Sequence, residues 1–189
     1  MSLLMDISSF KQRAYPYRFV MNQKEADLSW LLYSFKSSFT NQVYLVRVER
    51  YPYHFYGIKF YLKAHAHSDQ KYNLLTNFNE PRPILNTCIC IMLDIFQKDS
   101  KASFGFIGAE TLSEKEKRIA TGIESLTKRM SFYRRLLNTY FPQSNEYFEH
   151  YIDNQKSSYL IINRHQLETD SDLINKINSY FTEHYNDFD

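Results

Sequence analysis

The sequence predicts an α+β fold, with a mostly antiparallel sheet built from meander and hairpin strands and packed with about four helices. Short turns separate neighbouring strand patterns, and helical patterns lie between these groups of strands, which is typical of this class. Hydrophobic residues make up 43% of the 189 residues and aromatic residues 17%, which excludes a disordered chain. We expect one domain over residues 1–189, in which residues 1–14 could form a flexible N-terminal segment.

The first elements are predicted from aromatic and apolar spacing. Residues 15–21 are aromatic and β-prone, and they predict a strand. Apolar residues at spacings of three and four then predict a helix over about residues 24–39, with an apolar stripe formed by Leu28, Leu31, Leu32, Phe35 and Phe39. Two long strands are predicted at residues 42–51 and 53–64. Pro52 lies between them and marks the turn, because proline cannot donate to a strand ladder.

The strand over residues 53–64 alternates with a period of two. The set predicted to face the core is Tyr56, Ile58, Phe60, Leu62 and Ala64. The opposite, outward set contains Phe55, Lys59, Tyr61 and Lys63, with Arg47 as a possible neighbour. Aromatic residues interleaved with cations on a sheet can bind single-stranded nucleic acid. Cover of this face by another helix or subunit explains the same pattern and is the favoured interpretation.

The remaining elements follow along the chain. A polar turn at residues 65–70 leads to a third meander strand at 71–76, and residues 84–96 form an almost wholly apolar helix that starts after Pro83. A strand is predicted at 102–108. A long helical pattern then runs from the capping box of Ser113 and Glu116 to Pro142. A hairpin at 148–152 and 157–163 and a final helix capped by Asp170 complete the chain.

Charge, cysteine and glycine content limit the function classes. The formal net charge of +2 creates no general attraction to nucleic acid or membrane, so any electrostatic site must be local. Cys88 and Cys90 are too close in sequence to form a disulfide with each other, which favours a reduced, cytoplasmic setting. No apolar run approaches the roughly 20 residues that a bilayer requires. With four glycines, the nucleotide-binding loop motifs are missing, and we expect no cofactor.

The long helical pattern carries a cationic flank that is a candidate contact for nucleic acid or another anion. Its members are Lys117, Arg118, Lys128, Arg129, Arg134 and Arg135. Lys and Arg side chains dominate binding to phosphates, so such a stripe could hold a nucleic acid. The solvent-exposed face of an amphipathic helix has the same composition, and Glu114, Glu116 and Glu124 lie on the same helix. The solvent-face interpretation is favoured.

His65 and His67 are weak candidates for metal ligands. Residues two apart on a strand project to the same face, so both imidazoles could meet one ion. A third ligand would have to come from elsewhere, for example from Asp69 or His54. Because such short patterns often arise by chance, a polar strand end is the favoured interpretation, and no metal site is predicted.

Four segments resemble a small uncharacterised bacterial family common in Bacteroidetes, over roughly residues 42–163. These segments are Asn73-Leu74-Leu75-Thr76-Asn77, Pro83-Ile84-Leu85-Asn86-Thr87, Phe104-x-Phe106-Ile107-Gly108 and Thr127-x-Arg129-x-x-x-Tyr133-Arg134-Arg135. The chain departs from the family at Ala109, where the family has serine, and in an extra stretch at 110–126. The resemblance implies an α+β domain without an assigned activity. It also suggests a small anion pocket where Asn77, Gly108, Arg129 and Tyr133 converge, although Arg129 and Tyr133 could simply brace the strand ends.

Two functional hypotheses follow. The first is a cytoplasmic bacterial binding module. It is expected to be a homodimer, because the heptad-like seam and the aromatic strand face offer more apolar surface than a small domain needs. It would contact nucleic acid or another anion through the basic helix. The alternative is a small enzyme whose pocket uses Arg129 and Tyr133, or His65 and His67 with a metal ion. The sequence identifies neither substrate nor partner.

Overall fold

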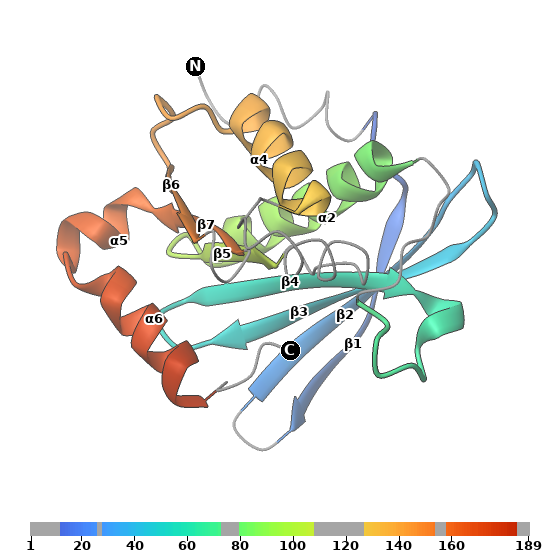
Figure 1. Ribbon diagram of the computed structural model, residues 1–189, viewed down its shortest axis with the longest axis horizontal. Coiled ribbons are helices and arrows are strands. Elements are labelled where there is room, and N and C mark those ends of the chain that lie inside the picture. Colours follow the sequence, from blue (N-terminus) through green and yellow to red (C-terminus); the bar gives the residue numbers. More distant parts are fainter. Residues whose placement is uncertain (1–11, 26–27, 73–79, 108–126, 154–157, 185–189) are drawn as a thin grey trace, which may run out of the picture. The chain divides into compact units, whose positions relative to one another are not determined.

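The computed structural model contains a seven-stranded sheet together with helices, which confirms the predicted α+β class (Figure 1). The structure describes residues 12–25, 28–72, 80–107, 127–153 and 158–184. The strand order in the sheet is β1-β2-β3-β4-β5-β7-β6, so neighbours in sequence are mostly neighbours in the sheet. The pairs β1 with β2, β5 with β7 and β6 with β7 are antiparallel, as meanders and hairpins require.

The elements of the described chain have the following bounds. The strands are β1 (Tyr17–Glu25), β2 (Leu28–Lys36), β3 (Val43–Tyr51), β4 (Phe55–Leu62), β5 (Ser103–Ile107), β6 (Phe148–Asp153) and β7 (Ser158–Asn163). The helices are the short 3-10 helix η1 (Lys63–His65), α2 (Pro81–Lys98), α4 (Lys128–Tyr140), α5 (Arg164–Thr169) and α6 (Leu173–His184). The chain divides into two compact units, of which unit 1 comprises residues 1–49 and 58–98 and unit 2 comprises residues 50–57 and 99–189.

The core of unit 1 is built from one face of β3 and from helix α2. Tyr44, Val46 and Val48 alternate along β3, and each is completely buried. Helix α2 is buried over an unbroken run from Ile84 to Leu93, which confirms the prediction of an almost wholly apolar helix. No helix within the described residues has the length and apolar character needed to span a membrane.

The prediction of a helix over residues 24–39 is wrong, because the structure has the strand β2 in this segment. In the sheet order β2 lies between β1 and β3, and the four residues 32–35 are all buried. A strand covered on both faces has apolar residues at consecutive positions, which hides the period of two and imitates helical spacing. Phe39, the last member of the supposed helical stripe, is 77% exposed.

Unit 2 contains β5, β6, β7, the helices α4, α5 and α6, and the tip of the β3–β4 hairpin. Phe55 at this tip is only 2% exposed, and its ring lies 6.2 Å from that of Tyr51 and 5.6 Å from that of Phe181 on α6. Cover by a helix, the favoured interpretation of the outward strand face, is therefore correct for Phe55, which packs against α6. Helix α5 was not predicted; Asn163 caps it by accepting a hydrogen bond from the Gln166 amide.

The other predicted elements are confirmed where the structure describes them. These are the strand at the N-terminus, the long strands β3 and β4, the strand β5, the β6–β7 hairpin and the final helix α6. Of the long helical pattern, residues 128–140 form α4, which begins after Thr127, whose hydroxyl accepts a hydrogen bond from the Met130 amide. Residues 113–126 lie outside the described residues. The proposed third meander strand has only residues 71 and 72 described, and both lie in a turn.

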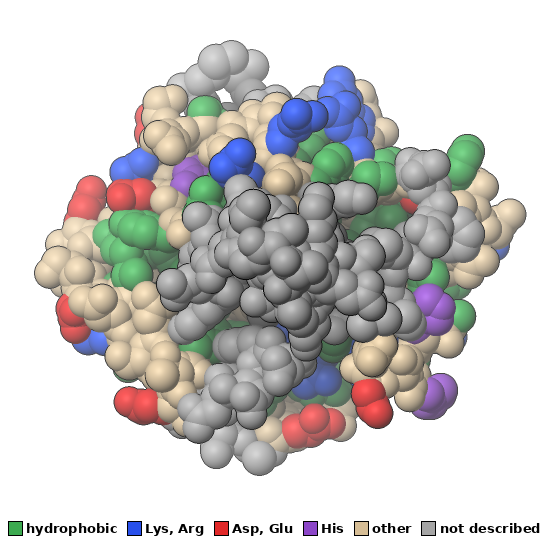
Figure 2. All heavy atoms as spheres, in the orientation of Figure 1, with side chains coloured by type: hydrophobic (Ala, Val, Ile, Leu, Met, Phe, Trp, Pro, Cys, Tyr) green, Lys and Arg blue, Asp and Glu red, His purple; other side chains and the backbone are tan. Residues whose placement is uncertain are grey.

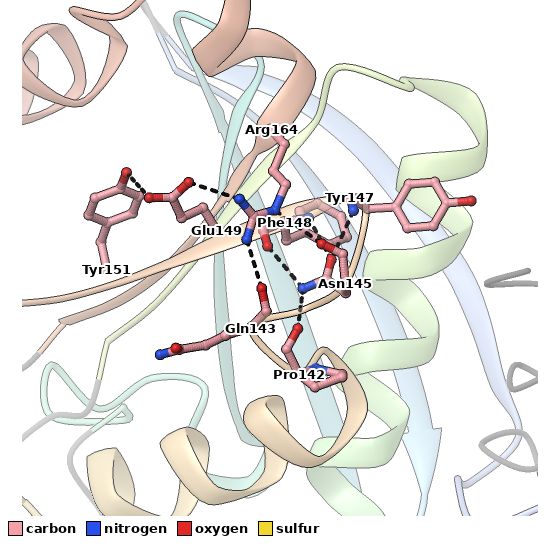
Figure 3. A network of polar contacts seen from close by, with 8 residues as sticks. All are labelled: Pro142, Gln143, Asn145, Tyr147, Phe148, Glu149, Tyr151 and Arg164. Carbon is pink, nitrogen blue, oxygen red and sulfur yellow. Dashed lines mark hydrogen bonds and ion pairs between the residues drawn. The ribbon is translucent and has the colours of Figure 1, made fainter. Parts of the chain in front are cut away.

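The turn between α4 and β6 is held by one arginine (Figure 3). Arg164 donates from Nε to the carbonyl of Asn145 at 3.1 Å, from one terminal nitrogen to the carbonyl of Gln143 at 2.8 Å, and from the other to Glu149 at 3.1 Å. The Asn145 side chain accepts from the Phe148 amide at 2.7 Å and donates to the Phe148 carbonyl at 2.9 Å. Because the donors of Arg164 are engaged inside this turn, the network is structural rather than a candidate ligand site.

Candidate functional site

The basic helix can be placed only in its C-terminal half. Lys117 and Arg118 lie outside the described residues, and of Lys128 and Arg129 only the backbone at the start of α4 is described. Arg134 and Arg135 are exposed, and neither makes an ion pair with a described residue. Figure 2 shows side chains of both charge signs on the visible face, in keeping with the net charge of +2. The described half of α4 thus has an exposed cationic side.

Of the four residues expected to form the pocket implied by the family resemblance, only Tyr133 has a described side chain. Asn77 and Gly108 lie outside the described residues, as does the side chain of Arg129. Tyr133 is 5% exposed, and its ring lies 5.8 Å from that of Phe106 on β5. Tyr133 is therefore part of the packing between α4 and β5 within unit 2.

The two weak metal candidates do not lie on a strand. His65 ends the short helix η1, and His67 follows in the next turn, so the premise that they project to one strand face is wrong. His65 Nδ1 is buried and has no hydrogen-bond partner among the residues described, and His67 is exposed. Among the residues that the structure describes, no group of three His, Cys, Asp or Glu side chains could hold a metal ion.

Three residues predicted at the outward strand face, Arg47, Lys59 and Tyr61, belong to a cluster of charged and aromatic side chains in unit 1. Arg47 and Glu49 alternate on β3, and Lys59 and Tyr61 alternate on β4, so each pair projects to one face of its strand. Residues of β2 and of the turn after η1 join them. We call this group the cation–aromatic cluster; its members are Trp30, Arg47, Glu49, Lys59, Tyr61, Lys71 and Tyr72.

One buried carboxylate organises the charges of the cluster. The Glu49 side chain is 6% exposed; its Oε1 lies 2.9 Å from Arg47 Nε and its Oε2 lies 2.6 Å from Lys59 Nζ. The side chains of Arg47 and Lys59 are each 21% exposed, so both cations reach the surface. Lys71 is the third cation and makes no ion pair with a described residue. With three cations and one carboxylate, the cluster keeps an excess of positive charge.

The aromatic rings of the cluster are in contact with its cations. The guanidinium carbon of Arg47 lies 4.6 Å from the ring centre of Trp30, and Lys71 Nζ lies 5.4 Å and 5.5 Å from those of Tyr61 and Tyr72. The two tyrosine rings meet edge to face at 5.2 Å. Burial raises the pKa of both tyrosines, so their hydroxyls stay protonated at neutral pH. Cations thus already lie over the ring faces of the cluster.

The cluster is rich in hydrogen-bond donors. Trp30 is 8% exposed, and its Nε1–H has no hydrogen-bond partner in the part of the chain that the structure describes, which is rare for a buried donor. The ammonium and guanidinium groups beside it are donors without acceptor capacity. A group with several acceptor oxygens and a negative charge would complement such a set. The chemistry of the cluster thus fits an anion such as a phosphate.

The sequence predicted part of this cluster. Arg47, Lys59 and Tyr61 were expected on one strand face with interleaved charge and aromatic character. Trp30 was missed because its segment was assigned to a helix, whereas Lys71 and Tyr72 reach the site only through the chain reversal after η1. The alternation of Arg47 with Glu49 was a signal that could have identified the carboxylate.

Comparisons of this chain with models of protein families, with curated proteins and with solved structures found no match. The resemblance to a Bacteroidetes-type family therefore stays a prediction.

Proposed function

We propose that this protein is a binding module whose cation–aromatic cluster contacts the phosphates of single-stranded nucleic acid. The observation that carries the proposal is a set of three cations, two of them paired with one buried carboxylate, beside a buried indole N–H that has no hydrogen-bond partner among the described residues. Phosphate contacts by Lys and Arg supply most of the affinity of nucleic-acid binding that is independent of sequence. A phosphate at Lys71 would also draw this ammonium away from Tyr61 and free the ring for stacking with a base.

A single strand fits this site better than a duplex. The side chains of Arg47 and Lys59 are each only 21% exposed, so a phosphate must approach the protein surface closely to contact them. A flexible strand can do so and can place a base on an aromatic ring, whereas the rigid surface of a duplex keeps its bases stacked.

The proposal is tested by fluorescence anisotropy with labelled single-stranded DNA and RNA at low salt. We expect Lys71→Gln to weaken binding by roughly fivefold and to reduce the salt slope by about 1, as the loss of one phosphate contact does. Lys71 is the best position to change because it makes no ion pair with a described residue, so no buried carboxylate is left alone. Lys98→Gln, at an exposed lysine that ends α2, is the matched control and should bind like the wild type.

Two results would contradict the assignment to the cluster. One is that the wild type fails to bind either single strand at low salt. The other is that Lys71→Gln binds like the wild type while Arg134→Gln with Arg135→Gln abolishes binding. The second result would move the contact to helix α4, where the sequence placed it.

We also propose that the protein forms a homodimer through β1. This strand is at one end of the sheet order, and three consecutive apolar residues on it are exposed: Phe19 at 55%, Val20 at 39% and Met21 at 42%. An unpaired strand edge with apolar side chains readily pairs with another strand. We expect sedimentation velocity to show a dimer that Phe19→Lys converts to monomer. A wild-type monomer at all concentrations would contradict this part of the proposal.

A further inference from the structure

A histidine and an aspartate form a hydrogen-bonded pair in unit 2, outside the cation–aromatic cluster. His54 Nδ1 lies 2.8 Å from Asp99 Oδ2 and 3.0 Å from Oδ1. The carboxylate also accepts from the Tyr56 hydroxyl at 2.8 Å and from the Lys101 backbone amide at 3.2 Å. Burial opposes ionisation of Asp99, but the hydrogen bonds from His54 and Tyr56 outweigh it and lower its pKa. Asp99 is therefore an anion that is fixed in place by three donors.

This contact determines which nitrogen of His54 is available. A carboxylate without a proton can only accept, so Nδ1 of the neutral imidazole carries the hydrogen and Nε2 carries the free electron pair. The His54 side chain is 40% exposed, and Nε2 has no hydrogen-bond partner among the described residues. A basic nitrogen in a fixed orientation is thus accessible to solvent.

The backbone that carries His54 is unusual for its residue types. Tyr53 and His54 both have left-handed conformations, with φ of 62° and 54°. Hairpin turns that need positive φ at consecutive positions normally use Asn or Gly. One backbone hydrogen bond holds His54 in this conformation, since its carbonyl accepts from the Ser103 amide at 2.9 Å. Non-glycine residues in this region are concentrated at functional sites, which indicates that the side chains themselves are needed here.

From this geometry we propose that His54 is the general base of a hydrolytic site for neutral carboxylic esters. The Asp99 carboxylate places a negative charge 2.8 Å from the imidazole, which disfavours an anionic substrate such as a phosphoester. Tyr53 is 43% exposed at the neighbouring position and offers an aromatic surface for the apolar part of an ester. The proposal is independent of nucleic-acid binding, because every residue in it belongs to unit 2.

The reaction is a simple hydrolysis. His54 Nε2 accepts a proton from water while the water oxygen forms a bond to the ester carbonyl carbon. The bond from this carbon to the leaving oxygen then breaks, and His54 returns the proton to the leaving oxygen. The products are a carboxylic acid and an alcohol, and nothing is oxidised or reduced. Asp99 is a positioning residue, since it orients the ring and stabilises the imidazolium that forms.

The experiment uses p-nitrophenyl acetate as the probe and measures kcat/KM for the full chain. His54→Asn is the decisive variant, because asparagine tolerates the left-handed backbone and keeps the turn while removing the base. We expect it to lower kcat/KM at least tenfold. His67→Asn makes the same change at an exposed histidine that has no carboxylate partner among the described residues, and it should leave the rate unchanged.

The test of Asp99 must measure a property that a purely structural residue would not change. We expect nitrogen NMR of the wild type to show the His54 proton on Nδ1, and Asp99→Asn to lose this preference together with most of the rate. Asp99→Glu should restore part of both. The proposal is overturned if His54→Asn hydrolyses the ester as fast as the wild type, or if His67→Asn loses as much. A D99N protein with an altered tautomer and an unchanged rate would overturn the positioning role.

Discussion

Glu80→Ala is expected to lower the free energy of unfolding by about 3–5 kcal/mol, because it leaves several buried hydroxyls without their acceptor. Glu80 immediately precedes helix α2 and is 6% exposed. Its Oε2 accepts hydrogen bonds from Tyr15 at 2.5 Å and Ser37 at 2.6 Å, and its Oε1 accepts from Thr40 at 3.0 Å and Tyr44 at 3.3 Å. One carboxylate thus ties the segment before β1, the end of β2 and the start of β3 to the start of α2.

Urea unfolding of Glu80→Ala, Glu80→Gln and a surface control measures this effect. Glutamine keeps one acceptor oxygen but loses the charge, so we expect about half of the loss seen with alanine. Glu183→Ala, at an exposed position on α6, should unfold like the wild type. Equal stabilities for Glu80→Ala and Glu183→Ala would show that the four hydroxyls find other partners.

The same site predicts an acid-dependent loss of stability. Burial opposes ionisation of Glu80, but the hydrogen bonds from Ser37 and Tyr15 outweigh it and lower its pKa below the ordinary 4.5. Because the folded state favours the charged form, this stabilisation is fully present above pH 4.5 and is lost as the pH falls through the pKa of the folded state. The stability difference between wild type and Glu80→Gln should therefore shrink in acid. A difference that stays constant down to the acid unfolding transition would contradict this.

The sequence predicted those parts of the fold in which the local pattern and the packing agree. Along strand β4 charged and aromatic residues alternate with apolar ones, and this alternation identified both the strand and the cation Lys59. Helix α2 is long and apolar and has two prolines in its first turn, which leaves few alternatives to a helix. The strand β2 was not predicted, for a physical reason: its consecutive residues 32–35 are all buried, so both faces of the strand are apolar there and the period of two disappears.

The sites depend on contacts between residues far apart in the chain, and a single sequence carries little trace of these. Glu80 and Tyr15 are separated by 65 positions, and His54 and Asp99 by 45. His54 was considered only as a further metal ligand, because nothing near it in sequence indicates the carboxylate that orients it. A single Glu before a proline is typical of the start of a helix. The four hydroxyl groups that donate to Glu80 are distant from it in sequence, and only folding brings them to its carboxylate.

Gly105→Val is expected to lower the free energy of unfolding by about 3 kcal/mol through overpacking of the core of unit 2. A Cβ at Gly105 would lie 2.6 Å from Phe55 Cζ and 3.3 Å from Leu160 Cδ2. The Phe55 ring has no room to retreat, because it is 2% exposed and packs against Tyr51 and Phe181. The better strand propensity of valine recovers less than about 1 kcal/mol of this cost.

A double-mutant cycle separates this clash from a general loss of strand stability. Phe55→Leu removes the ring atom that blocks the Cβ, so in its background Gly105→Ala should cost about 1–2 kcal/mol less than in the wild type. Gly57→Ala is the matched control on β4, since its Cβ would lie 3.0 Å from Tyr51 Cε2, a less severe contact. Thermal or urea unfolding of the wild type and these variants measures each change in the free energy of unfolding. If the losses of unfolding free energy caused by Gly105→Ala and Phe55→Leu are strictly additive, the backbone of β5 shifts to accommodate the alanine side chain. The Phe55 ring would then not be the reason that this position requires glycine.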